Sequence, residues 1–448
     1  MAGGLMQLVA YGAQDIYLTG NPMITYFKVV YRRHTNFAME PIQQTFNGNA
    51  NFGSKVTALM SRNGDLVSGV TLEATLPALD GAADRYIDDV GHHLIQEVSI
   101  DIGGQPIDKH YADWLEVWAQ LTVPAGHEAG YRRMIGQTQT SINGTPGGLQ
   151  VDTDTAAGAA DSNVAQDRKV YVPIQFWFCR NVGLALPLIA LQYHEVRMTV
   201  LFARSTHLIC TDDASTPTGT TSSLADAALW VDYIYLDTDE RRRFAQISHE
   251  YLIEQLQFTG DETYDASVGA GTSPGSLSIS LNFNHPVKEL IWVCRESSRT
   301  TRNLGQWSNY TTVEADADGN NSLAKDPSTP GTGRARNPVA TAKLQLNGHD
   351  RLATRDGTYF NLVQSRCHRR IPQSPGINVY SFALKPEDHQ PSGTCNFSRI
   401  DNARLVMTLG GTGGSGTGML SGGVIKVFAT NYNVLRVMSG MGGLAYSN

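Results

Sequence analysis

The sequence is poor in charge, and its N-terminal segment lacks cations altogether. Charged residues make up 17% of the 448 residues, and the formal net charge is −7. The first 27 residues contain no lysine or arginine. A segment that binds nucleic acid needs many cations to neutralise phosphates and release counterions. We therefore expect no direct nucleic-acid binding.

Cysteines and long apolar runs are also scarce. The five cysteines are odd in number and none forms a CxxC pair, which predicts free thiols made in a reducing cytosol. The N-terminus lacks the charged start and apolar core of a signal peptide. The longest strongly apolar run, residues 183–191, has about half the length that spans a bilayer. We expect a protein that is made in the cytosol and spans no membrane.

The chain contains a long internal repeat. Residues 99–108 and 343–352 both read as a strand, a two-residue turn with glycine and a second strand. The other matched pairs follow in the same order: 42–48 with 254–260, 170–174 with 379–383, 196–200 with 403–407, and 230–237 with 424–431. The repeat is too long for a solenoid unit. It indicates a duplicated domain.

Glycine, of which there are 44, and the alternation of apolar and polar residues favour antiparallel strands with many turns. The clearest strand-like stretches are 55–60, 66–76, 97–102, 168–173, 195–202 and 229–236. We predict an all-β fold of two tandem eight-stranded antiparallel jelly-roll barrels, with long loops and a few short helices. The predicted parts are an N-terminal arm (1–26), a first jelly roll (27–237), a connector (238–246) and a second jelly roll (247–448).

Two helices and five long loops complete the prediction. Trp114, Leu115 and Trp118 have helical spacing within residues 111–121. Residues 237–246 begin with acids and end with bases, which suits the dipole of a short connecting helix. The loops, which we expect to be exposed, are 136–167, 203–227, 261–276, 315–338 and 410–423.

Several motifs resemble catalytic or metal sites without completing them. Gly411–Gly416 matches GxGxxG but leads into a strand instead of a helix. Asp316, Asp318 and Asn320 are spaced like calcium ligands, yet the later positions of that loop do not fit. The pairs His92–His93 and Cys367–His368 lack second pairs at ligand spacing. We predict no catalytic residue, no metal and no cofactor.

Four glycosylation sequons occur, and a cytosolic protein would not meet the secretory enzymes that read them. Chance is therefore the default explanation, and only the loop sites Asn309 and Asn320 are kept as possible acceptors. The sequons are Asn143, Asn309, Asn320 and Asn396.

Several segments resemble the major capsid proteins of the nucleocytoplasmic large DNA viruses, in particular the phycodnavirus-like branch. They are 11–22, 25–37, 185–195, 282–286, 390–401 and 432–446. The resemblance implies a structural, non-enzymatic subunit whose homotrimers form pseudo-hexagonal capsomers of an icosahedral virion shell, assembled in the host cytoplasm. It also implies contacts with neighbouring capsomers, with minor capsid proteins beneath the shell, and proximity to an internal membrane.

The N-terminal arm is rich in hydrophobic residues and almost without charge, which matters if the chain is a capsid subunit. We expect it to be extended, to lie beneath the capsomer and to bind through Leu5, Met6, Leu8, Val9 and Leu18; a disordered terminus is the alternative. The C-terminal residues 440–446 would behave similarly. Two other functions stay open: a secreted-type double-jelly-roll carbohydrate-active enzyme or lectin, and a minor capsid or vertex protein.

Overall fold

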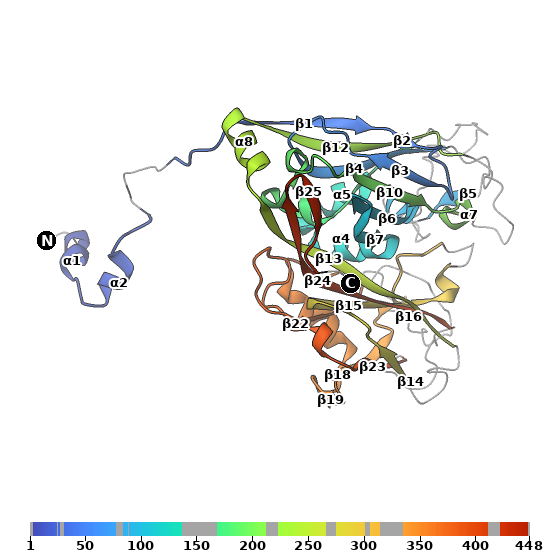
Figure 1. Cartoon of the computed structure of the whole chain (residues 1–448). Coiled ribbons are helices and arrows are strands. Elements are labelled where there is room, and N and C mark those ends of the chain that lie inside the picture. Colours follow the sequence, from blue (N-terminus) through green and yellow to red (C-terminus); the bar gives the residue numbers. More distant parts are fainter. Residues whose placement is uncertain are drawn as a thin grey trace, which may run out of the picture. The chain divides into compact units, whose positions relative to one another are not determined.

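The computed structural model divides the chain into two compact units, Met1–Phe37 and Ala38–Asn448. Figure 1 shows the course of the chain. The structure describes residues 3–24, 26, 31–77, 84–87, 89–136, 168–211, 223–265, 275–300, 305–313, 335–410 and 422–446. Most of four of the predicted long loops lies outside these residues, as does the middle of the fifth, 203–227. The GxGxxG motif and the calcium-like spacing at 316–320 also lie outside them.

The N-terminal unit contains two short helices, α1 (Gly3–Val9) and α2 (Asp15–Thr19). The prediction of an extended arm was therefore wrong for these residues. Leu5, Leu8 and Val9 have the i, i+3 and i+4 spacing of one helix face. The Asp15 carboxylate accepts a hydrogen bond of 2.7 Å from the Gly12 amide just before α2. Neither helix buries a residue.

The first half of the large unit, from β1 to β12, holds two main antiparallel sheets. One has the order β1-β12-β4-β8 with β9 paired to β4, and the other has the order β2-β3-β10-β6-β7. A two-stranded sheet pairs β11 with β5. The bounds are β1 Phe37–Gln44, β2 Phe46–Asn47, β3 Lys55–Leu59, β4 Leu66–Leu76, β5 Asp84–Tyr86, β6 Ile95–Ile102, β7 Gln105–Tyr111, β8 Arg168–Pro173, β9 Leu186–Pro187, β10 Val196–Phe202, β11 Ile209–Thr211 and β12 Asp226–Leu236.

The second half, from β13 to β25, repeats this arrangement. One sheet has the order β13-β24-β15-β21 with β22 and β25 at its margins, and the other has the order β14-β23-β18-β19 with β20 paired to β18. The strands β16 and β17 pair separately. The bounds are β13 His249–Tyr264, β14 Gly275–Ser280, β15 Pro286–Glu296, β16 Thr312–Val313, β17 Ala335–Arg336, β18 Val339–Leu346, β19 His349–Asp350, β20 Arg355–Asp356, β21 Ile377–Ser381, β22 Cys395–Asn396, β23 Ala403–Leu409, β24 Gly423–Met438 and β25 Met441–Leu444.

The matched segments fall on strands with the same neighbours in the two halves. The first pair forms the hairpins β6–β7 and β18–β19. Their turn residues all have positive φ: 59° and 84° at Gly103 and Gly104, and 51° and 80° at Asn347 and Gly348. Two consecutive left-handed residues are the geometry of a type I′ turn, which explains glycine and asparagine there. The predicted strands are confirmed, and β4 and β8 have the predicted bounds.

Two matches have the right strands in the wrong register. Trp230 of β12 lies opposite Thr71 of β4, and Phe428 of β24 lies opposite Ile291 of β15. Thr71 and Ile291 are equivalent, because β4 and β15 are both 11 residues long and alternate their core side chains in the same way. Trp230 therefore corresponds to Phe428, four residues beyond the residue that the sequence match pairs with it. Likewise, Pro173 of β8 lies opposite Thr71, and Val379 of β21 lies opposite Ile291, so the match of 170–174 with 379–383 is shifted by three residues.

Both predicted helices of the large unit are present. The predicted helix at 111–121 is α4 (Ala112–Thr122), and the connector forms α8 (Thr238–Gln246), in which Arg241 pairs with Asp65 at 3.0 Å. Within the described residues, no helix is long and apolar enough to cross a bilayer. The remaining helices and helical turns are α3 Val90–Leu94, η1 Ala125–His127, α5 Glu128–Met134, α6 Trp177–Arg180, η2 Val182–Leu184, η3 Leu188–Ala190, α7 Ser205–Leu208, η5 Ser297–Thr300, η6 Tyr359–Gln364, η7 Ser365–Cys367 and η8 Phe397–Arg399.

Each half encloses its own hydrophobic core between its two sheets. In the first half, alternate residues such as Val70 and Leu72 of β4 point into the core, and in the second half Leu290 and Trp292 of β15 do so. Figure 1 shows the layers in order: the sheet of β1, β12 and β4, the sheet of β10, β6 and β7, then α4, and then the sheet of β13, β24 and β15. The helix α4 is therefore placed between the two halves.

Candidate functional site: the interface between the two halves

The side of α4 that faces the second half is apolar. It packs on the outer face of the sheet β13-β24-β15-β21. Trp114 lies with its ring centroid 5.3 Å from that of Trp118 and 5.5 Å from that of Phe428. Burying large side chains of this kind contributes about 1.5–3 kcal/mol each. The buried set is Trp114, Val117, Trp118, Leu121, Ile291, Val293, Tyr310, Ile377, Val379 and Phe428.

A buried carboxylate at the start of α4 binds three groups of the second half. The Asp113 Oδ1 atom accepts hydrogen bonds from Arg295 Nη1 at 2.7 Å and from the Tyr310 hydroxyl at 2.8 Å. Its Oδ2 atom lies 2.6 Å from Lys426 Nζ. Burial by itself would raise the pKa of Asp113, but the charges of Arg295 and Lys426 hold that pKa well below its ordinary value. Asp113 is therefore ionised and fully paired inside the interface.

A second cluster has the opposite arrangement, with the carboxylate on the second half. Glu254 Oε2 lies 2.9 Å from Arg180 Nη1 of the first half and 2.7 Å from Lys288 Nζ. The guanidinium of Arg180 also lies 4.0 Å from the ring centroid of Trp118, a cation–π contact. Lys288 is fully buried and donates to the Pro386 carbonyl at 2.6 Å.

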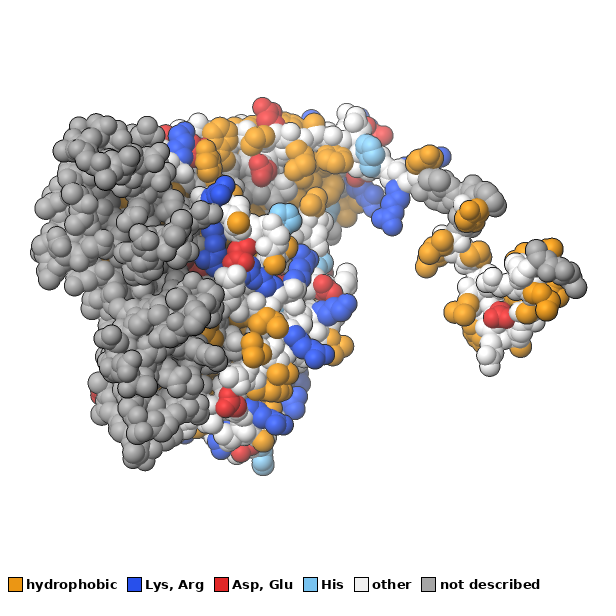
Figure 2. Space-filling model, turned by 180° about the vertical axis from the view of Figure 1, so that it is seen from behind, with side chains coloured by type: hydrophobic (Ala, Val, Ile, Leu, Met, Phe, Trp, Pro, Cys, Tyr) orange, Lys and Arg blue, Asp and Glu red, His pale blue; other side chains and the backbone are white. Residues whose placement is uncertain are grey.

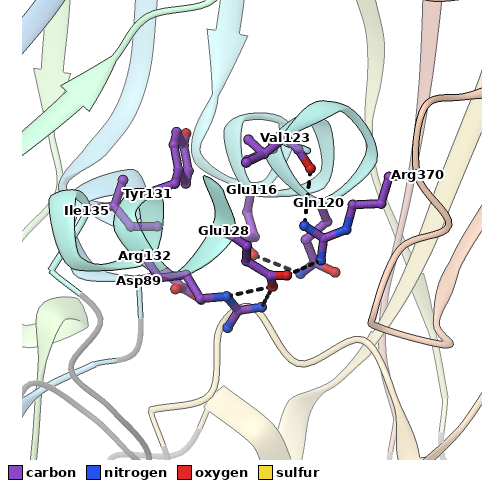
Figure 3. Close-up of a pocket in the computed structure, with 10 residues that line it drawn as sticks. Asp89, Glu116, Gln120, Val123, Glu128, Tyr131, Arg132, Ile135 and Arg370 are labelled. Carbon is purple, nitrogen blue, oxygen red and sulfur yellow. Dashed lines mark hydrogen bonds and ion pairs between the residues drawn. The ribbon is translucent and has the colours of Figure 1, made fainter. Parts of the chain in front are cut away.

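A third, partly open cluster lies at the edge of the interface (Figure 3). Glu128 Oε2 lies 2.8 Å from Arg370 Nη2 of the second half, and Glu128 Oε1 lies 2.8 Å from Arg132 Nη2. Arg370 also donates to the Val123 carbonyl at 3.2 Å, and Gln373 connects Glu128 and Arg132. The space beside these residues measures about 20 Å³, which is room for about one water molecule.

Behind this cluster, Glu116 and His92 form a buried pair, with 2.7 Å between Glu116 Oε2 and His92 Nδ1. Burial would raise the pKa of Glu116, but the hydrogen bond with His92 lowers it to about 2. The other ring nitrogen of His92 lies 2.8 Å from the Tyr131 hydroxyl. His92 is therefore a buried structural residue.

The C-terminal hairpin reaches back onto the first half. Gly442 of β25 lies against Leu191 and Ile102, and a Cβ atom at this position would force the end of the Leu191 side chain to move. Its carbonyl lies 2.9 Å from His194 Nδ1, and Leu444 packs against the first core. Residues 440–446 were expected to act as an arm, and that prediction was wrong for 441–444, because they pair with β24.

These contacts make the interface selective for one arrangement of the two halves. Removing one partner of a buried ion pair costs about 3–5 kcal/mol, because the remaining charge stays buried without compensation. Sliding one half over the other would break the Asp113, Glu254 and Glu128 clusters together. The apolar contacts provide affinity, and the buried charges penalise every other relative position.

The structure brings none of the predicted site residues into this interface. The arm residues Leu5, Met6, Leu8, Val9 and Leu18 belong to the N-terminal unit and are 56–84% exposed. Asn320 and Asn143 lie outside the described residues.

Asn309 lies within the large unit, and its side chain is engaged. It is buried; its Nδ2 atom donates to Gln306 Oε1 at 2.9 Å, and its Oδ1 atom accepts from the Thr311 hydroxyl at 2.6 Å. A glycan on Nδ2 is incompatible with this conformation, so we do not propose Asn309 as an acceptor.

The sequence analysis did not identify the interface residues, because they form no recognisable motif. A signal does exist: Lys288, Arg295 and Lys426 interrupt strongly apolar strands. A charged residue in such a strand is rarely buried without a partner. The sequence could therefore have predicted that these cations have buried acidic partners, although not which acids.

The repeated sheet order, together with the structural matches that follow, places the protein in the class of viral capsid proteins with the double jelly-roll architecture. The protein matches a chain of the quasi-atomic model of the PBCV-1 virus capsid with a TM-score of 0.75 and 39% identity, over 95% of this chain and 100% of that one. The Faustovirus major capsid protein has a TM-score of 0.68 at 15% identity, covering 97% of this chain and 96% of that one, which shows the fold alone.

Sequence comparisons identify the family. Residues 25–237 match the major capsid protein N-terminus, and residues 240–443 match the large eukaryotic DNA virus major capsid protein. The chain is 50% identical to the major capsid protein of Pyramimonas orientalis virus and 47% identical to that of Phaeocystis pouchetii virus, over 100% of both chains in each case. The chain belongs to the large eukaryotic DNA virus major capsid protein family, a family of structural proteins of the virion shell.

Proposed function

We propose that this chain forms homotrimers whose six jelly rolls give a pseudo-hexagonal capsomer, and that these capsomers tile an icosahedral shell. The observation that carries the proposal is the repeated sheet order in a chain of this family. Two like domains per chain and three chains per capsomer provide six similar corners, so one kind of subunit can cover a facet. The chain would act as a structural component, without catalysis or a cofactor.

The domain boundaries follow from this proposal. Residues 27–237 and 247–448 would each form an eight-stranded jelly roll, and residues 238–246, which form α8, would connect them. The four strands β1-β12-β4-β8 and the four strands β3-β10-β6-β7 support eight strands for the first, with β2 and β9 as additions. The orders β13-β24-β15-β21 and β14-β23-β18-β19 support the same number for the second.

The N-terminal arm, residues 1–26, would bind beneath the capsomer. Its support is the set of apolar side chains that the N-terminal unit itself leaves exposed, among them Leu8 at 78% and Leu18 at 84%. The partners would be neighbouring capsomers and minor capsid proteins beneath the shell, close to an internal membrane. Assembly would take place in the host cytoplasm, without direct binding of nucleic acid. A glycan on Asn320 stays a proposal of lower rank.

Native mass spectrometry and negative-stain imaging of the purified full chain test the central proposal. We expect a mass of three chains and particles with three-fold symmetry and six density lobes. A protein that stays monomeric at high micromolar concentration would contradict the proposal. None of the relatives named above is described as a carbohydrate-active enzyme or a lectin, so that alternative gains no support.

A further inference from the structure

The outer face of one sheet is buried in the second half, and the equivalent face of the first half is partly exposed. In the second half, Ile291 of β15 lies opposite Phe428 of β24 and Val379 of β21. Its neighbour Val293 lies opposite Ile377. All five side chains are buried beneath α4 of the first half. This face exists as an interface within the chain.

The equivalent positions of the first half have the same pairing, and among the described residues no helix packs on them as α4 packs on the second half. Thr71 of β4 lies opposite Trp230 of β12 and Pro173 of β8, and Glu73 lies opposite Tyr171. Tyr171 is 38% exposed, and the other four are partly exposed. We call these five residues the open face. Two aromatic residues at the exposed outer side of a sheet are typical of the interior of a protein contact.

The second half also has a counterpart of α4. Trp118 of α4 and Leu362 of η6 each follow the second residue of the type I′ turn, Gly104 and Gly348, by 14 residues. Trp118 is 5% exposed, because it lies against the second half. Leu362 is 49% exposed and its neighbour Val363 is 48% exposed. Leu362 is therefore an exposed apolar counterpart of Trp118, which α4 buries against the second half.

From these two surfaces we infer that the open face binds the η6 segment, centred on Leu362 and Val363, of a second copy of this chain. The inference rests on the proposed function and names its subunit contact. The two halves stack in the same direction within the chain, as the layers of Figure 1 show. Such a head-to-tail stack leaves the open face exposed at one end and the η6 segment exposed at the other. Repeating the contact between them from copy to copy with a rotation closes a ring.

The charge of Glu73 on the open face does not prevent contact with an apolar segment. Glu73 Oε1 lies 2.8 Å from Lys169 Nζ, and Glu73 Oε2 accepts a hydrogen bond of 2.7 Å from the Trp230 indole. The carboxylate is therefore neutralised before an apolar segment covers it. The open face is more polar than its counterpart, which has isoleucine and valine where it has Thr71 and Glu73. A surface that stays in water until subunits meet is expected to be more polar than one buried during folding.

On the surface view of Figure 2, hydrophobic side chains lie among lysines and arginines outside the grey regions. Exposed apolar residues are thus spread over the surface, and exposure alone does not identify a contact. The open face and the η6 segment are distinguished by their equivalence to an interface that already exists within the chain.

Site-specific photocrosslinking tests the contact. The crosslinking amino acid p-benzoylphenylalanine replaces Tyr171 in the full chain, and the control carries it at Tyr193, an exposed tyrosine of the same half. Irradiation should join two copies from position 171, with the second attachment site within residues 357–367. The control should give no product in that segment.

Paired variants supply a second measurement. Leu362→Asp with Val363→Asp should raise the concentration at which trimers dissociate at least ten-fold in sedimentation velocity. Leu384→Asp, at an exposed leucine of the same half, should leave it unchanged. Wild-type trimers that crosslink elsewhere, or that tolerate the double variant, would overturn this inference and leave the proposed function standing. A wild-type chain that never trimerises would contradict both.

Discussion

Replacing Asp113 by asparagine should destabilise the protein strongly, although the side chain keeps its size. The asparagine oxygen can still accept the hydrogen bonds from Arg295 and Tyr310, but Arg295 loses its ion-pair partner and Lys426 keeps only the half-exposed Asp261, 3.3 Å away. Arg295 is 8% exposed and cannot regain water without opening the interface. Breaking a buried pair costs about 3–5 kcal/mol, so we expect a loss of about this size in the free energy of unfolding.

Urea unfolding followed by tryptophan fluorescence measures this loss, because Trp114 and Trp118 lie in the same interface. Glu195→Gln is the matched control: it removes the charge from a pair with Arg197 in which both side chains are more than half exposed. Exposed pairs contribute about 0–1 kcal/mol. If Asp113→Asn unfolds within about 1 kcal/mol of the wild type, the reasoning that buried charges fix the interface is refuted.

Three further predictions concern other parts of the chain. The His368 ring lies 2.9 Å from Glu289; although burial opposes its charge, the two nearby glutamates raise the pKa of His368 to about 9. The charged His368 should therefore add about 3 kcal/mol to the free energy of unfolding below pH 6.5, and this contribution should disappear as the pH rises through 9. The melting temperatures of the wild type and of His368→Gln should accordingly converge above pH 9. Gly376→Ala should lower the yield of folded protein, because the new Cβ atom would collide with the Tyr310 carbonyl. The control Gly104→Ala, where only the positive φ opposes a side chain, should lower the free energy of unfolding by about 1 kcal/mol in chemical denaturation. Deleting residues 2–22 should leave trimers intact in native mass spectrometry but prevent shell assembly in electron micrographs; normal shells would contradict the proposed role of the arm.

The regular part of the fold could be predicted from local sequence patterns. The alternation in residues 66–76 predicts β4 because one face of that strand is buried and the other is not. The turn residues at 103–104 and 347–348 predict the two hairpins, since few residues other than glycine and asparagine adopt positive φ. Such signals act between neighbours in the chain and need no knowledge of the rest.

The helices of the arm were missed for the opposite reason. Residues 3–9 are short and contain two glycines, which lower helix propensity, and no charged residue marks either end. The register of the last repeat was also wrong, because sequence similarity between two apolar strands changes little when one is shifted by four residues. Pairing with Thr71 and Ile291 determines that register, and only the sheet contains this information.

Local patterns along the chain are enough to predict two β domains of the same kind and membership among capsid proteins. Duplication, alternation and turn chemistry are encoded in residues close together along the chain, and family motifs are read in the same way. How the two halves are joined becomes visible only in the folded molecule. Asp113 meets Arg295 and Lys426 across more than 180 residues, and a partner for a buried charge is selected by three-dimensional proximity, on which the order of residues along the chain places no direct constraint.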